Sequence, residues 1–333
     1  MHADGETVPA RPRAGGAVLS LLAGPLCVPI LRAHLEGPLR LPDLRERIGG
    51  AAQTTLRGQV GNLRGFGALE RRVIPGMPYT VENALTECGR EILEVADYVE
   101  AWLSRAPQGS IVLGSEAAKG AIRSLVAGWS STVLRALAAR PLSLTELSGV
   151  IPNLSYPSLE RRLSAMRASR QIEIESGGPG KAKPYSVSEW TRQAVAPLAA
   201  AARCECRHLS DVTDAIGERD VEAVFLLAIP LAELPAGQSG SCLFAVGSPD
   251  PEEAEDDPRV AGVHVEVRRG EVVSCASRLE RDPETWALGP VDAWADAILA
   301  GELESLRIGG RESQCAEGLI ESMHRALAPR VAA

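Results

Sequence analysis

The sequence predicts a mainly α-helical chain that ends in an α+β domain, and three observations support this fold class. First, the stretch from Ile30 to Glu70 recurs without a gap 103 positions later, as Val133 to Glu173, with eleven identical positions. Second, apolar residues in both stretches recur at the spacing of helices. Third, apolar and polar residues alternate in the last third of the chain. A repeat of this length indicates a duplicated domain and not a solenoid.

Each copy of the repeat predicts three short helices followed by a β-hairpin. In the first copy, Leu56, Val60 and Leu63 form the apolar stripe of the third helix. In the second copy, Ser143 and Glu146 have the spacing of a capping box that opens the middle helix. Extended residues and a turn rich in glycine and proline follow the third helix in both copies. Three helices and a hairpin make a winged helix.

The pattern divides the chain into four parts. Residues 1–16 lack periodicity and predict a disordered arm. Residues 17–107 and 108–207 predict two tandem winged helix domains, and residues 208–333 predict an α+β domain that senses a ligand.

The run from Gly37 to Ile92 resembles the HxlR family of bacterial winged helix-turn-helix regulators. Its most specific part is VENALTECG, from Val81 to Gly89, which is similar to the second wing strand and the start of the last helix of that family. The second copy resembles the family more distantly. The resemblance implies transcriptional regulation through binding of double-stranded DNA.

In this architecture the third helix of each winged helix lies in the major groove. Gly58 and Gly61 occupy positions where the family usually carries long polar or cationic side chains, so we expect the second copy to supply most of the DNA affinity. The predicted DNA-binding residues lie on the two third helices and on the second wing: Gln53, Thr54, Thr55, Arg57, Ser155, Tyr156, Ser158, Arg161, Arg162, Lys181 and Lys183. Ser155 is expected to cap its helix, and Pro157 suits the first turn.

The formal net charge of −8 is unevenly distributed along the chain. The balance is zero in residues 1–107, +6 in residues 108–207 and −14 in residues 208–333. A polyanion is attracted to the middle of the chain and repelled by its last third. The overall acidity therefore does not exclude DNA binding.

From Asp211 the pattern becomes that of an α+β domain. Val221 to Ile229 and Ser241 to Val246 predict buried strands. Alternation from Val263 to Val267 predicts a strand with one buried face, which turns at Arg269 and Gly270 into the next strand. Two helices, Val291 to Leu299 and Glu312 to Leu327, are expected to close the domain.

The segment from Thr285 to Gly310 resembles sterol carrier protein domains, in which a sheet and such helices enclose an apolar tunnel. The resemblance implies a small apolar ligand, and Phe244, Trp286 and Trp294 are the predicted ligand-binding residues. The alternative, that the two tryptophans are ordinary core residues, stays open.

The helices that flank the wings, Glu87 to Leu103 and Glu189 to Arg203, have apolar faces. Relatives in the HxlR family pair through such helices. The resemblance therefore implies either a monomer with an internal pseudo-dimer or a homodimer.

The sequence contains no phosphate-binding Gly-Lys-Ser loop, no nucleophile elbow and no histidine pair with metal spacing. We therefore expect no enzymatic activity, catalytic residue, metal or cofactor. Seven scattered cysteines argue against a disulfide framework. Because the sequence lacks a long apolar run and a signal peptide, we expect a cytoplasmic protein without a membrane partner.

These observations predict a ligand-responsive DNA-binding transcriptional regulator. Arginine greatly outnumbers lysine, as in proteins of high-GC actinobacteria, where such regulators often lie beside antibiotic biosynthesis pathways; this favours a role in a secondary-metabolite or resistance pathway. One alternative is a drug-binding, self-resistance protein that kept the fold and lost DNA affinity. Another is a biosynthetic enzyme or accessory protein that uses an inter-domain cavity.

Overall fold

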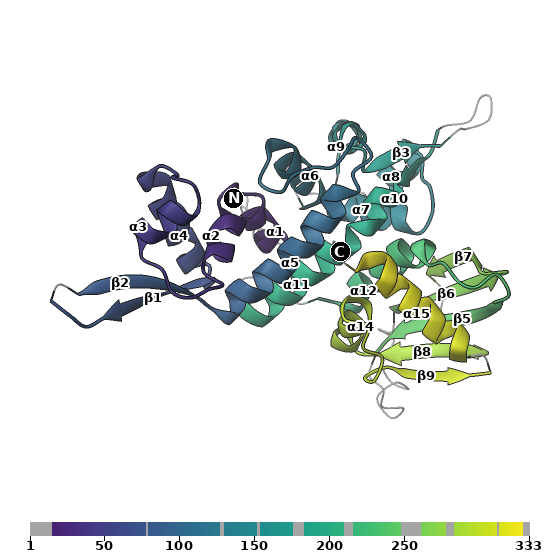
Figure 1. Ribbon diagram of the computed structural model, residues 1–333. Coiled ribbons are helices and arrows are strands. Elements are labelled where there is room, and N and C mark those ends of the chain that lie inside the picture. The colour runs from purple at the N-terminus through teal and green to yellow at the C-terminus, as the bar shows by residue number, and fades with distance from the viewer. Residues whose placement is uncertain are drawn as a thin grey trace, which may run out of the picture.

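The computed structural model consists of three units that meet at two central helices (Figure 1). The N-terminal unit runs from α1 (Gly16–Leu22) to α5 (Glu87–Ser104), the middle unit from α6 (Glu116–Val126) to α11 (Val195–His208), and the C-terminal unit from α12 (Glu218–Ala228) to α15 (Ser313–Leu327). Helices α5 and α11 lie side by side at the centre. The structure describes residues 15–77, 79–126, 130–151, 154–175, 183–209, 216–247, 261–277, 283–311 and 313–328.

The N-terminal unit consists of short helices followed by a hairpin. Leu44, Leu56 and Leu63 are fully buried, because the helical spacing places them on the inner faces of α3 (Leu41–Arg47) and α4 (Gln53–Gly65). Most of the arm predicted for residues 1–16 lies outside the described residues; Gly15 is the N-cap residue of α1 and Gly16 is its first residue. The other elements are α2 (Cys27–Ala33), β1 (Leu69–Ile74) and β2 (Thr80–Leu85).

The base of the hairpin is held against the start of α5. Strands β1 and β2 are antiparallel, with Leu69 opposite Leu85. The hydroxyl of Thr86 accepts a hydrogen bond from the Gly89 backbone N–H (3.1 Å) and so caps α5. A Cβ atom at Gly89 would lie 2.3 Å from the carbonyl oxygen of Ala68, so this contact requires glycine.

The middle unit has the same order of elements after its first helix. Helices α8 (Leu144–Val150) and α9 (Tyr156–Ala168) begin and end 103 positions after α3 and α4. An isolated β-bridge joins Leu39 to Asn83 in the N-terminal unit, and another joins Leu142 to Tyr185 in the middle unit. The remaining elements are α7 (Ser130–Ala138), β3 (Ile172–Ile174), β4 (Tyr185–Val187) and α10 (Glu189–Gln193).

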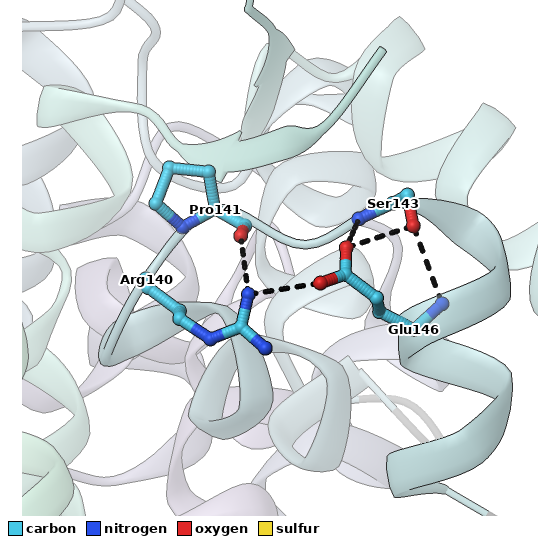
Figure 2. Close-up of polar contacts among 4 residues, drawn as sticks. All are labelled: Arg140, Pro141, Ser143 and Glu146. Carbon is cyan, nitrogen blue, oxygen red and sulfur yellow. Dashed lines mark hydrogen bonds and ion pairs between the residues drawn. The ribbon is translucent and has the colours of Figure 1, made fainter. Parts of the chain in front are cut away.

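The predicted capping box at the start of α8 is confirmed (Figure 2). The Ser143 hydroxyl accepts a hydrogen bond from the Glu146 backbone N–H (3.3 Å), and a carboxylate oxygen of Glu146 accepts one from the Ser143 backbone N–H (2.8 Å). Arg140 donates to the other carboxylate oxygen (3.0 Å). Two backbone N–H groups that the helix leaves unpaired are thereby satisfied.

The C-terminal unit is a five-stranded sheet with helices packed against it. The sheet order is β7-β6-β5-β8-β9; β5 and β8 are parallel, and the other neighbouring strands are antiparallel. The predicted strand at 241–246, the alternating strand and its turn are confirmed, as is the helix from Val291. The elements are β5 (Gly240–Val246), β6 (Ala261–Arg268), β7 (Glu271–Ser277), β8 (Thr285–Gly289), α14 (Val291–Leu299) and β9 (Arg307–Gly310).

The strand predicted for Val221 to Ile229 is wrong, because these residues form most of α12 and the start of the 3-10 helix η1 (Ile229–Leu231). A short apolar run does not by itself distinguish a buried strand from a buried helix. The residues before it carry the helix signal: Glu218 and Asp220 lie in the first turn, and Asp220 accepts a hydrogen bond from the Gly217 backbone N–H (3.0 Å).

Side chains from the two central helices hold the C-terminal unit in place. The Tyr98 hydroxyl on α5 donates to the carbonyl oxygen of Leu299 (2.9 Å). Arg203 on α11 forms an ion pair with Asp296 on α14 (3.0 Å). The C-terminal unit therefore contacts both of the other units.

No single helix of the described residues is long and apolar enough to cross a membrane; α1 and α2 together meet the length and composition criteria, with a bend of 84° between them. In the same residues no three His, Cys, Asp or Glu side chains are grouped as they would need to be to hold a metal ion.

Candidate nucleic-acid interface

Helix α4 presents a polar face to solvent at its N-terminal end. Gln53, Thr54, Thr55 and Arg57 are all exposed, while Leu56 on the same turn is buried against the core. The exposure follows from the 3.6-residue period, because the apolar stripe alone faces inward. The four side chains predicted to contact DNA are thus brought together on one accessible surface.

Gly58 and Gly61, two of the three glycines of α4, are also exposed. An added Cβ atom at Gly58 or Gly61 would meet nothing within 4 Å, so packing does not require glycine at either position. Each glycine lowers helix stability by roughly 1 kcal/mol relative to alanine and offers no side chain to a ligand.

The hairpin β1–β2 projects away from the body of the N-terminal unit (Figure 1). Every residue of β1 after Leu69 is exposed, including Arg71 and Arg72. Arg72 forms an ion pair with Glu70 (2.6 Å). The sequence prediction did not include Arg71 and Arg72, although the Glu-Arg-Arg run before the hairpin turn is a visible signal for an exposed basic strand.

Helix α9 is the counterpart of α4 in the middle unit and carries three arginines where α4 carries two, although Glu160 leaves both helices with a net charge of +2. Tyr156 and Arg161 are exposed, and Arg162 is half-buried. Ser158, Arg161 and Arg162 line a surface hollow of about 430 Å³ together with Leu154 and Ala165. Three of the predicted residues, Ser158, Arg161 and Arg162, are therefore brought together at one concave site, whereas Ser155 and Tyr156 do not line it.

Ser155 is the N-cap residue of α9, as predicted, but its side chain does not cap the helix backbone. Its hydroxyl donates a hydrogen bond to the hydroxyl of Ser158 (2.9 Å). Pro157 does lie in the first turn, as predicted.

The second wing is only partly described. Lys183 is exposed next to β4, whereas Lys181 lies outside the described residues. Arg167 and Arg170 are exposed near the C-terminal end of α9 and were missed by the sequence prediction.

Several arginines of the two units form ion pairs, whereas in the described residues Arg57, Arg161 and Arg162 share with Arg64 and Arg123 the lack of one. Arg32, Arg40 and Arg47 each form an ion pair with a neighbouring carboxylate. Across the described ranges no carboxylate forms an ion pair with Arg57, with Arg161 or with Arg162. A guanidinium without a protein partner is free to bind a phosphate oxygen.

Residues 24–109 match the family described as HxlR-like helix-turn-helix. This part of the chain is an HxlR-like helix-turn-helix domain. It contains α4, the hairpin β1–β2 and α5.

Two curated relatives are similar to part of this chain. The uncharacterized HTH-type transcriptional regulators YtfH of Escherichia coli (strain K12) and YtfH of Shigella flexneri are each 38% identical over 75 residues, which is 21% of this chain and 60% of the relative. The chain thus spans 60% of the length of these curated relatives.

Two solved structures of the transcriptional regulator YodB from B. subtilis are also similar. The diamide-treated form is 28% identical, over 27% of this chain and 88% of YodB, with a TM-score of 0.26. The reduced form is 27% identical, over 28% of this chain and 90% of YodB, with the same TM-score of 0.26.

Outside the HxlR-like domain, the structure does not bring the three predicted ligand-binding residues together. Phe244 and Trp294 are fully buried and form an aromatic cluster with Phe225, with ring centroids 4.6–5.8 Å apart. The Trp294 indole N–H donates to the carbonyl oxygen of Ala245 (2.9 Å). Phe244 is therefore a core residue.

Trp286 lies on the opposite face of the sheet from Phe244. In the register of β5 and β8, Trp286 is beside Leu243, and Phe244 is beside Ala287. Successive side chains of a strand point to opposite faces, so Trp286 and Phe244 cannot line one cavity inside the sheet layer. Trp294 borders a cavity that lies between the middle and C-terminal units, and this cavity is not lined by Phe244 or Trp286.

Proposed function

We propose that this protein is a ligand-responsive transcriptional regulator that binds double-stranded DNA through α4, α9 and the two wings. The HxlR-like domain supports DNA binding, and the observation that carries the proposal is the set of exposed arginines without carboxylate partners at the start of both helices. Arg57 and Arg161 lie where a third helix meets the major groove. As a DNA-binding regulator the protein would act in the cytoplasm.

The middle unit is proposed to be a second winged helix that arose by tandem duplication. Matched positions 103 residues apart support this origin, because α3, α4 and one β-bridge all have counterparts. The caps of the following helices also correspond. The Thr86 hydroxyl donates to the carbonyl oxygen of Gly67 (2.7 Å), and the Ser188 hydroxyl donates to that of Arg170 (2.8 Å).

The two winged helices are proposed to pair within one chain, which favours a monomer with an internal pseudo-dimer over a homodimer. Ile92, Ala96 and Val99 on α5 are fully buried, and α11 packs against this helix. A surface covered within the chain is not accessible to a second copy.

The open positions at Gly58 and Gly61 favour a second candidate, a drug-binding protein with reduced DNA affinity. Neither glycine offers a side chain to a phosphate. The two candidates make different predictions for DNA binding, whereas both include a small apolar ligand. An experiment on DNA therefore separates them.

The deciding experiment is selection of bound duplexes from a random DNA pool by the full-length protein, followed by titration of the enriched sequence at several salt concentrations. The regulator requires an enriched sequence and an affinity that falls steeply with salt, because cations on α4 and α9 would release counterions from DNA. Absence of enrichment, with weak binding to every duplex, would contradict the regulator and favour the drug-binding protein. Lys119→Ala, on α6, is a control for charge loss outside the proposed interface.

A role in a secondary-metabolite, antibiotic or resistance pathway is part of the same proposal. It rests on composition, and the test is to identify which transcripts change when the gene for this protein is deleted.

A further inference from the structure

A cavity of about 420 Å³ lies where the middle unit meets the C-terminal unit. Its walls come from five helices: α6, α7 and α11 of the middle unit, and α12 and α14 of the C-terminal unit. Protein interiors contain few voids larger than a water molecule, so a space of this size is not ordinary packing. Pockets for small ligands span roughly 300–1,000 Å³.

The cavity wall is almost entirely apolar. Leu198 and Ala199 on α11, Val224 on α12, and Val291 and Ala295 on α14 all border it, and each retains some exposure to solvent. Five partly exposed apolar side chains at one concave surface leave water next to hydrocarbon. A bound apolar molecule would displace this water, which is favourable in proportion to the apolar area that it covers.

The charged groups at the cavity neutralise one another. Arg135 on α7 and Asp220 on α12 both border it and form an ion pair with each other across the two units. The site therefore offers no uncompensated charge to a ligand. This arrangement matches a neutral molecule with at most a polar group at the Arg135–Asp220 end, and disfavours an anion or a cation.

We propose that this cavity is a binding site for one neutral, mainly apolar small molecule that contacts the middle and C-terminal units at once. The site lies between the units and not inside the sheet layer of the C-terminal unit.

The position of the site also suggests how it regulates, and this step alone rests on the proposed function. Helix α7 lines the cavity and leads directly into α8 and α9, which carry the proposed DNA contacts. A ligand that binds one placement of α7 relative to α12 more tightly shifts the population toward that placement. Ligand and DNA then alter each other's affinity by the same factor.

The test uses the full-length protein and Nile red, a neutral apolar dye whose fluorescence rises in apolar surroundings. Saturable binding of one dye per chain is expected. Ala295→Phe places a bulky side chain in the cavity and is expected to weaken dye binding at least tenfold. Ala300→Phe is the matched control, because Ala300 is exposed just beyond the end of the same helix and does not border the cavity; we expect a change of less than twofold.

A second variant and a folding check distinguish a blocked cavity from misfolding. Ala199→Phe enters the cavity from α11 and is expected to weaken dye binding as Ala295→Phe does, with circular dichroism and the unfolding midpoint showing that both variants remain folded. Absence of saturable binding to the wild type would overturn the proposal, including the case in which another segment of the chain fills the cavity. Unchanged binding in both folded phenylalanine variants would also overturn it.

DNA titration without dye keeps the two proposals separate. If the wild type binds Nile red at this site and selects no DNA sequence, the site stands and the regulator fails. If DNA binding is specific and the dye does not bind, the regulator stands and the site fails.

Discussion

Trp102 and Trp190 donate hydrogen bonds to each other's backbone. Each indole N–H lies 2.9 Å from the carbonyl oxygen of the other residue, and the two rings are stacked with centroids 4.7 Å apart. Trp102 lies near the end of α5 and Trp190 at the start of α10, so the pair joins the N-terminal and middle units. At the other end of α5, Glu91 forms an ion pair with Arg207 near the end of α11 (3.5 Å). Helices α5 and α11 are therefore antiparallel.

We predict that Trp102→Phe and Trp190→Phe each lower the free energy of unfolding by roughly 2 kcal/mol. Each change removes one buried hydrogen bond, worth about 1 kcal/mol, and leaves a small cavity. The double variant should lose less than the sum, because the two residues act as one contact. Urea unfolding followed by circular dichroism measures these values. Trp286→Phe, on a half-buried residue of the C-terminal unit, is the control, and strict additivity of the pair would contradict the coupling.

Replacing glycine with alanine should have opposite effects on the free energy of unfolding in α4 and in α5. Gly58→Ala and Gly61→Ala should each raise the free energy of unfolding by up to about 1 kcal/mol, because the added methyl meets nothing within 4 Å and alanine favours the helix. Gly89→Ala should be destabilising, since its Cβ would lie 2.3 Å from the Ala68 carbonyl oxygen. Thermal unfolding distinguishes the signs. A loss of stability in the α4 variants would show that these glycines serve the fold.

Glu205 is a buried carboxyl that caps α1 from the distant end of α11. It accepts hydrogen bonds from the backbone N–H groups of Gly15 (2.8 Å) and Val18 (2.7 Å). Burial raises the pKa of Glu205 above 4.5, and the hydrogen bonds oppose that shift. The unfolded chain then releases this proton first as pH rises. The stability from this group is greatest below pH 4.5 and falls as pH rises through the higher folded pKa.

We therefore expect Glu205→Gln to remove part of the decrease in stability above pH 4.5. Urea unfolding at a series of pH values from about 4 to about 8 compares the slopes of wild type and variant. Glu205→Ala should be clearly less stable than Glu205→Gln at every pH, because alanine leaves two buried N–H groups without an acceptor. Identical slopes in wild type and glutamine variant would rule out a raised pKa.

Glu146 should show the opposite pH dependence. The backbone N–H and hydroxyl of Ser143, together with Arg140, lower the pKa of Glu146 from 4.5 to about 2. The stability from this carboxylate is present above pH 4.5 and is lost as pH falls toward 2. Glu146→Gln keeps the capping geometry and loses the charge, so its stability should fall less steeply between pH 4.5 and 2. Glu160→Gln, on the exposed face of α9, is the comparison; an equal effect there would exclude a special role for the capping box.

DNA affinity should depend more on the middle unit than on the HxlR-like domain. Replacing Arg161, Arg162, Lys181 and Lys183 with alanine is expected to reduce the log–log salt slope of binding by about 0.9 for each phosphate that is no longer neutralised. Arg268→Ala, an exposed arginine of the C-terminal unit, should leave the slope unchanged. Filter binding from low to high salt measures both. If the quadruple variant keeps the wild-type salt slope and Arg57→Ala lowers it, the main phosphate-binding groups lie on α4.

Local patterns in the sequence were sufficient to predict the helices and strands that bury a single apolar stripe or face. The 3.6-residue period of Leu56, Val60 and Leu63 predicted α4 and, with it, the exposed face of Gln53 and Arg57. These features depend only on neighbours within a few residues, which the sequence shows directly. The same reasoning failed at Val221 to Ile229, because a short apolar run fits a strand or a helix equally well.

Sequence patterns were enough to predict the helices and hairpins of the two repeats and the polar face of the proposed interface. The folded structure was needed to show that Phe244 and Trp286 lie on opposite faces of a sheet, that Glu205 caps α1, and that an apolar cavity lies between α7 and α14. Such relations join residues far apart in the chain. They depend on how the surfaces of whole helices and strands pack together. The periodicity of apolar residues indicates which face of an element is buried, but not which other element covers that face.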